Sequence, residues 1–116
     1  MGMVASVTIW VGVNTDSDTE NSIDLTSLLN ENQCDELDNS GGIEIEGLTF
    51  KIFYRFDEEV GFGVELFSRS YFHGVTELNL QDLLSKSQEL LRKVRNVFQS
   101  WASEIEPKVF IDMDHS

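Results

Sequence analysis

The chain has 116 residues, which suits one domain that buries roughly two-thirds of its unfolded surface, so we expect a single domain over residues 1–116. Its formal charge of -13 is uneven: residues 1–50 hold ten acidic side chains and no lysine or arginine, and the remainder holds eleven acidic and eight basic ones. Such a charge is repelled by nucleic acids and by anionic membranes, and we expect neither as a partner.

The N-terminal third predicts a strand followed by a short helix. Val4–Val13 alternates between apolar and polar residues, as a strand with one apolar face does. After a polar stretch, leucines at helical spacing favour a short helix within 25–37, although asparagines oppose it. The Asn-Ser-Gly-Gly sequence at 39–42 then breaks the chain.

The middle of the chain predicts strands joined by tight turns. Ile43 and Ile45 lead into Glu46-Gly47, which fits a two-residue hairpin turn. Alternating residues then predict strands over 48–56 and 60–66, with residues 57–59 as the turn and Phe56 facing Val60. In this register three cross-strand pairs form: Lys51 with Glu65, Ile52 with Val64, and Phe53 with Gly63.

A long amphipathic helix is expected from Leu80 to Ile105, because apolar residues recur there at the helical period. Asn79 is placed to cap it, and Pro107 to end it. We also expect three side-chain pairs along it: Leu78 with Leu83, Asp82 with Lys86, and Glu89 with Lys93. Residues 108–113 alternate again and predict a last strand.

These elements predict an α+β fold. It has a mainly antiparallel sheet of four to five strands, one long C-terminal amphipathic helix packed on one face, and a short helix near the N-terminus. If 43–56 were one strand instead of a hairpin, the order would become β-α-β-β-α-β, the ferredoxin-like pattern.

No set of residues in the sequence indicates catalysis, a metal or a cofactor. Asp16, Asp18 and Glu20 have the spacing of a calcium loop, but Asn21 and Ser27 stand where that loop needs glycine and glutamate. The single cysteine forms no intrachain disulfide and fits a reducing, cytoplasmic location. We therefore expect a non-enzymatic protein without catalytic or metal-binding residues.

Two surfaces are candidates for binding. Carboxylates of the N-terminal half are expected to contact a basic protein: Asp16, Asp18, Glu20, Asp35, Glu36 and Asp38. Aromatic residues on the sheet face away from the long helix are candidates for a homodimer or a client: Trp10, Phe53, Phe67 and Tyr71. The alternative for the aromatic residues is that the segment 25–37 covers them.

Part of the chain resembles the HicB-type antitoxins. Residues 54–64, Tyr-Arg-Phe-Asp-Glu-Glu-Val-Gly-Phe-Gly-Val, are similar to the strand, acidic turn and Gly-aromatic second strand of that family, and Gly74-Val75-Thr76 is similar to the segment before its helix. The proline-rich segment and the cysteine of the family are missing here, and an extra strand comes first. The resemblance covers about forty residues and implies an acidic protein that neutralises a basic one, without assigning the family.

Together these features favour an acidic binding protein that caps a basic partner, such as an immunity protein, an antitoxin or another inhibitor of a protein that acts on nucleic acids. The alternative is a small acidic chaperone or assembly subunit that uses the aromatic sheet face.

Overall fold

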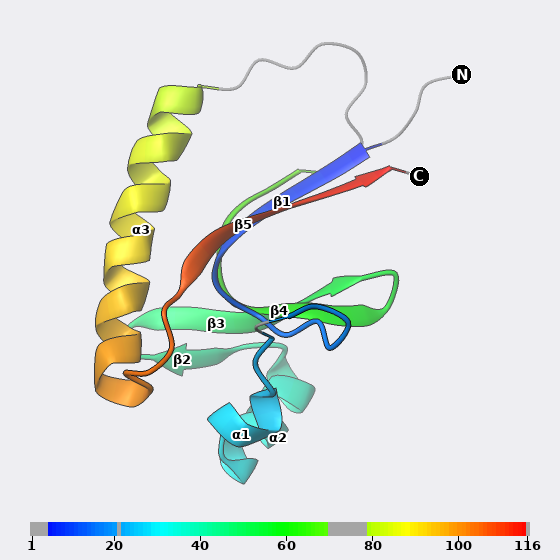
Figure 1. Ribbon diagram of the computed structural model, residues 1–116, viewed down its shortest axis with the longest axis vertical. Coiled ribbons are helices and arrows are strands. Elements are labelled where there is room, and N and C mark those ends of the chain that lie inside the picture. The colour runs from blue at the N-terminus through cyan, green and yellow to red at the C-terminus, as the bar shows by residue number, and fades with distance from the viewer. Residues whose placement is uncertain (1–4, 21, 70–78, 116) are drawn as a thin grey trace.

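The computed structural model describes residues 5–20, 22–69 and 79–115 (Figure 1). Within them, five strands and three helices form, in chain order β1 (Ala5–Asn14), α1 (Leu25–Leu28), α2 (Glu31–Ser40), β2 (Ile43–Ile45), β3 (Leu48–Arg55), β4 (Glu58–Arg69), α3 (Leu80–Trp101) and β5 (Lys108–His115).

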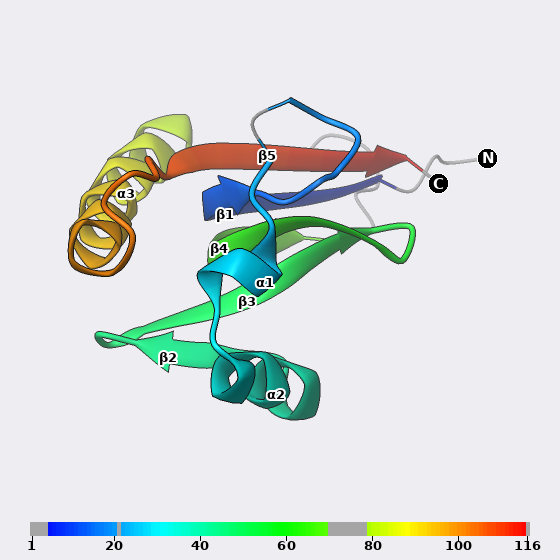
Figure 2. The same cartoon turned by 60° about the horizontal axis from the view of Figure 1, so that its bottom comes forward.

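The five strands form one sheet in the order β2-β3-β4-β1-β5, and every neighbouring pair is antiparallel. Figure 2 shows this order from β5 at the top to β2 at the bottom. The expected α+β fold is therefore confirmed: an antiparallel sheet with a long C-terminal helix packed on it and short N-terminal helices.

The sheet is strongly bent, with α3 on its convex side (Figure 1). Two glycines pair directly across the centre of this sheet, Gly12 of β1 with Gly63 of β4. A Cβ atom on Gly12 would lie 2.1 Å from the carbonyl oxygen of Phe62, and one on Gly63 would lie 2.1 Å from that of Val11. Both glycines are thus required by the close approach of the two backbones.

The hydrophobic core lies between the convex face of the sheet and the helices, and we call this side the core face. Its aromatic centre is Phe50, whose ring centroid lies 5.4 Å from that of Phe62 and 6.1 Å from that of Phe98 on α3. The other buried members come from β1, β2, the three helices and the C-caps of α1 and α3: Val11, Val13, Leu25, Leu29, Leu37, Ile43, Val94, Val97 and Ala102.

The first hairpin is confirmed. Ile43–Ile45 pairs antiparallel with β3, and Glu46 and Gly47 form the turn with φ angles of 48° and 83°. Two consecutive left-handed residues match the right-handed twist of a hairpin. The alternative of one continuous strand over 43–56 is therefore wrong, because the chain reverses direction at Glu46.

The second hairpin forms, but its expected register is wrong by two residues. Phe56 and Asp57, with φ angles of 50° and 65°, make a two-residue turn in place of the three-residue turn 57–59. The observed pairs are Lys51 with Gly63, Ile52 with Phe62, and Phe53 with Gly61.

The changed register keeps the expected ion pair but exposes the end of β3. Lys51 still reaches Glu65 diagonally across the two strands, with Nζ 2.7 Å from Oε1. The register shifts between Phe53 and Tyr54, where Val60 of β4 has no partner in β3. Tyr54 at the end of β3 and Phe56 in the turn are exposed and not inward as expected.

The predicted helix within 25–37 is divided into two. Leu29 has extended backbone angles, and Asn30 starts α2 with a capping box in which its side chain and that of Gln33 bond each other's backbone N–H groups. Gly41 ends α2 in the left-handed conformation, which confirms the break expected there.

The long helix starts as expected and ends four residues early. Asn79 caps α3 by accepting a bond from the Asp82 N–H. The two expected ion pairs form, with N···O distances of 3.0 Å for Lys86–Asp82 and 3.6 Å for Lys93–Glu89. Leu78 lies outside the described residues. The helix ends at Trp101 because Ala102 takes a non-helical φ of -150°. No helix in the described ranges is long and apolar enough to cross a membrane.

Candidate functional site: an acidic groove

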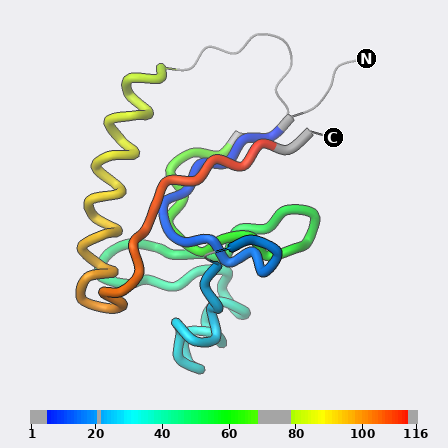
Figure 3. Tube along the Cα trace, in the orientation of Figure 1, coloured from blue at the N-terminus to red at the C-terminus, as the bar shows by residue number. Residues whose placement is uncertain are grey.

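A groove of about 780 Å³ lies between the segment that follows β1 and the start of β4. Two backbone hydrogen bonds hold this segment in place: Thr15 N–H donates to Val60 O at 3.1 Å, and Ile23 N–H donates to Asn14 O at 2.8 Å. Figure 3 shows that the chain after β1 passes beside the β3–β4 hairpin. Pairing of β1 with β4 therefore brings two acidic segments together that are far apart in the sequence.

Five carboxylates line this groove, and none of its lining residues is a lysine or an arginine. We call it the acidic groove, and its carboxylates are Asp16, Asp18, Asp24, Glu58 and Glu59. Apart from the half-buried Asp16, all of them are exposed. Like charges gathered around a concave surface produce a negative potential that attracts cations from solution.

The segment 14–19 is shaped by its own polar side chains. The Asn14 side chain accepts a bond from the Asp16 N–H, and the Asp16 carboxylate accepts one from the Asp18 N–H, each at 3.0 Å. The Thr19 N–H and hydroxyl both donate to the Asp16 carbonyl oxygen. These turns fix the backbone, while the carboxylate of Asp18 stays exposed at the groove.

Asp24 forms the N-cap of α1 on the other side of the groove. The Thr26 hydroxyl donates to its carboxylate at 2.8 Å and the Thr26 N–H at 3.0 Å. These hydrogen bonds lower the pKa of Asp24 below its ordinary value, because they stabilise the ionised form. Asp24 therefore keeps its negative charge throughout the neutral pH range.

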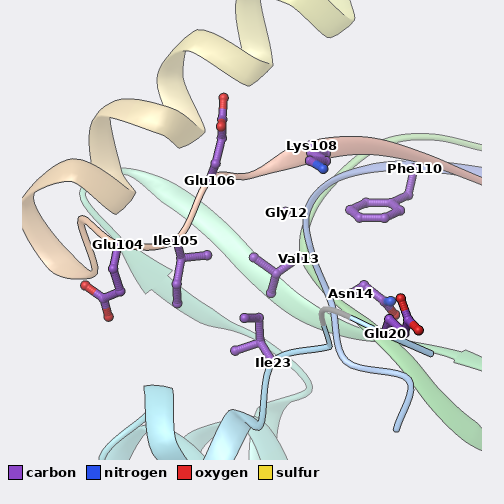
Figure 4. Close-up of a pocket in the computed structure, with 10 residues that line it drawn as sticks. All are labelled: Gly12, Val13, Asn14, Glu20, Ile23, Glu104, Ile105, Glu106, Lys108 and Phe110. Atoms are coloured by element: carbon purple, nitrogen blue, oxygen red, sulfur yellow. The ribbon is translucent and has the colours of Figure 1, made fainter. Parts of the chain in front are cut away.

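Glu20 lies in a different depression, of about 400 Å³, with Glu104, Glu106 and Lys108 (Figure 4). Glu20 and Asn14 line this depression from the end of β1 and the segment after it, whereas Glu104 and Glu106 come from the segment between α3 and β5. Glu20 thus does not line the acidic groove, although it follows Asp16 and Asp18 in the sequence.

The remaining acidic residues expected at the binding surface lie on α2. Asp35, Glu36 and Asp38 are exposed on that helix and do not line the acidic groove. Of the six predicted carboxylates, only Asp16 and Asp18 line the acidic groove.

Two of the four aromatic residues expected on an exposed sheet face are buried. On the face opposite the core face, the Trp10 ring stacks between Phe53 and Phe110 at centroid distances of 4.9 and 4.3 Å. Trp10 is 3% exposed and Phe53 7%, so they offer little surface to a partner.

The other two expected residues do not form this surface either. Phe67 pairs with Ile9 of β1, and Ile9 lies on the same face of β1 as the core residue Val11. Phe67 is therefore on the core-face side of the sheet. Tyr71 lies outside the described residues.

Among the described residues, no group of three or more His, Cys, Asp or Glu side chains is arranged to hold a metal ion. Cys34 is a free, half-buried thiol on α2 that packs against the core. Its position indicates a packing role.

Three groove residues were not predicted as binding residues: Asp24, Glu58 and Glu59. Glu58 and Glu59 were expected in an exposed turn, and Asp24 is an ordinary helix cap. No local pattern identifies Glu58 and Glu59, because their proximity to Asp16 depends on which strand pairs with β1. A prediction of the β1–β4 pair would have found them.

No family model matches this chain, and neither the curated proteins nor the solved structures contain a significant match. The likeness of residues 54–64 to the HicB-type antitoxins thus stays a resemblance of a short segment. The acidic groove is the feature of the described residues from which a function can be inferred.

Proposed function

We propose that this protein is a non-enzymatic binding protein whose acidic groove holds a basic segment of a protein partner. The observation that carries the proposal is the concave arrangement of five carboxylates in a groove whose lining includes no lysine or arginine. A partner of this kind could be a toxin or nuclease whose nucleic-acid site is basic, and the carboxylates would then take the places of phosphates.

The shape of the groove supports a peptide segment or side chains as its occupant. Its volume of about 780 Å³ exceeds what one ion needs, and its wall includes apolar residues, Ile23 and Leu25, beside the carboxylates. Arginine and lysine combine a cationic end with an apolar stem, so they suit a surface of this mixed character.

Electrostatic steering gives such a complex a fast association. The whole chain carries a formal charge of -13, which attracts a basic protein over distances longer than the groove itself. The groove carboxylates then act at short range, where they pair with individual cationic groups.

The proposal is tested with a ten-residue arginine-rich peptide as the probe, by calorimetry or fluorescence anisotropy. Reversing three exposed groove charges, Asp18→Lys, Glu58→Lys and Glu59→Lys, should weaken binding by about tenfold or more, because close charge pairs are lost and repulsion replaces them. None of these three side chains accepts a hydrogen bond within the described structure, so the fold should be retained.

The α2 acids provide a matched control. The variant with Asp35→Lys, Glu36→Lys and Asp38→Lys changes the net charge by the same amount on exposed residues outside the groove. It should bind the peptide nearly as well as the unmodified protein. Equal losses in both variants would show that net charge alone governs binding, and would refute the groove as the site.

The alternative function, a chaperone or assembly subunit, depends on an exposed aromatic face of the sheet. Burial of Trp10 and Phe53 removes the centre of that surface. The acidic groove is therefore the better supported site.

A further inference from the structure

The sheet has one long open edge. β5 pairs only with β1 among the described strands and is the outermost strand over eight residues, Lys108–His115. The opposite edge is β2, with only three residues. An edge strand presents unpaired backbone N–H and C=O groups, and short edge strands are one way in which proteins prevent further pairing. β5 lacks this protection.

The same strand exposes apolar side chains on the core-face side of the sheet. Val109, Ile111 and Met113 are 38%, 63% and 53% exposed, and they pair with Val11, Ile9 and Val7 of β1. The apolar surface of the sheet thus continues to its edge, and none of the residues that the structure describes covers it there. Exposed apolar side chains on an open edge strand are typical of an interaction surface.

We propose that β5 pairs with β5 of a second copy of this chain, antiparallel about a two-fold axis at Ile111, so that the two sheets become one. In this register Ile111 faces its own copy, and Val109 faces Met113 of the second copy. A two-fold interface must be complementary to itself, and this strand satisfies that requirement with its apolar residues.

The charge nearest the proposed two-fold axis is neutralised within each copy. Asp112 is next to Ile111 in β5, and the guanidinium of Arg55 lies 2.7 Å from the Asp112 carboxylate. Repulsion close to the axis is therefore small.

Cysteine cross-linking tests the register directly, in a Cys34→Ser background that removes the native thiol. Paired residues in an antiparallel ladder have Cα atoms about 4.5–5.5 Å apart, within the range of a disulfide. Ile111→Cys should therefore form a covalent dimer under mild oxidation. Val109→Cys should not, because its two copies lie four residues out of register, about 14 Å along the strand. Cross-linking of Val109→Cys without Ile111→Cys would overturn the proposed register.

Sedimentation equilibrium tests the dimer without any cross-link. The unmodified protein should be dimeric at tens of micromolar, and Ile111→Lys should raise the dissociation constant at least about tenfold, because two lysines then meet at the axis. Leu84→Lys is the matched control, since Leu84 is 58% exposed on α3 and away from β5. Circular dichroism checks that both variants fold. An unmodified protein that stays monomeric at all concentrations, or equal effects of both variants, would refute the proposal.

Discussion

At the scale of single residues, the face of the sheet opposite the core face is organised around Trp10. Its indole lies between two phenylalanine rings and covers Gly61, where a side chain would have no room. The indole N–H is buried and has no partner among the described residues, so stacking and burial alone stabilise the ring in this place. Residues that look like an exposed aromatic patch in the sequence thus form a second, smaller apolar cluster.

Gly61→Ala should destabilise the protein, because the added Cβ would lie 2.0 Å from Cη2 of Trp10 and force the ring out of its stack. We expect a loss of about 1–3 kcal/mol in the free energy of unfolding, measured by urea denaturation. Gly42→Ala is the control, since its Cβ comes no closer than 3.3 Å to any atom. Similar losses for both variants would contradict the importance of the Trp10 contact.

At the scale of elements, polar caps and turns decide where each segment begins and ends. The two N-terminal helices are separated at Leu29 and Asn30 because Asn30 starts a new capping box. Both hairpins reverse through pairs of left-handed residues, Glu46-Gly47 and Phe56-Asp57. Only one of these four residues is a glycine, which explains why the second turn was placed wrongly from the sequence.

Asn30→Ala should lower the free energy of unfolding by about 1 kcal/mol, because the first turn of α2 loses its cap. Asn32→Ala, two residues later and exposed within the same helix, should have no cost or a small gain, because alanine is the better helix former. Thermal unfolding monitored by circular dichroism measures both. A neutral effect at Asn30 would show that packing alone fixes the start of α2.

At the scale of the whole molecule, charge and shape act in different places. The acidic groove lies where the segment after β1 meets the start of β4, and the open apolar edge lies on β5. One feature attracts opposite charge, and the other requires two molecules of formal charge -13 to approach each other. The two proposed interactions therefore respond to salt in opposite directions.

Raising the salt concentration from about 20 to about 300 mM should weaken binding of the arginine-rich peptide and strengthen the dimer, because screening reduces the attraction in the first case and the repulsion in the second. Calorimetry and sedimentation equilibrium at the same salt concentrations measure the two effects independently. Peptide binding that does not change with salt would contradict the groove proposal and leave the dimer proposal standing. A dimer that dissociates as salt rises would contradict the repulsion between copies expected from the net charge.

The sequence by itself determined most of the elements of this protein, because an element depends on neighbours close along the chain; the division of the segment 25–40 into α1 and α2 was not predicted. Alternation located β1, β3 and β5, and the helical period with the Asn79 cap located the start of α3. The ion pairs on α3 followed from a spacing of four residues, which a helix always brings onto one side.

Only the tertiary structure decided how these elements combine. The register of β3 on β4 depended on a turn that began one residue earlier than predicted, and the burial of Trp10 depended on the rings that β3 and β5 bring beside it. The acidic groove needed β1 to pair with β4, which brings Asp16 and Asp18 to the same concave surface as Glu58 and Glu59. The contacts of Trp10 and of the acidic groove join residues about forty to one hundred positions apart. Side-chain periodicity carries no information about which distant strand will be the neighbour.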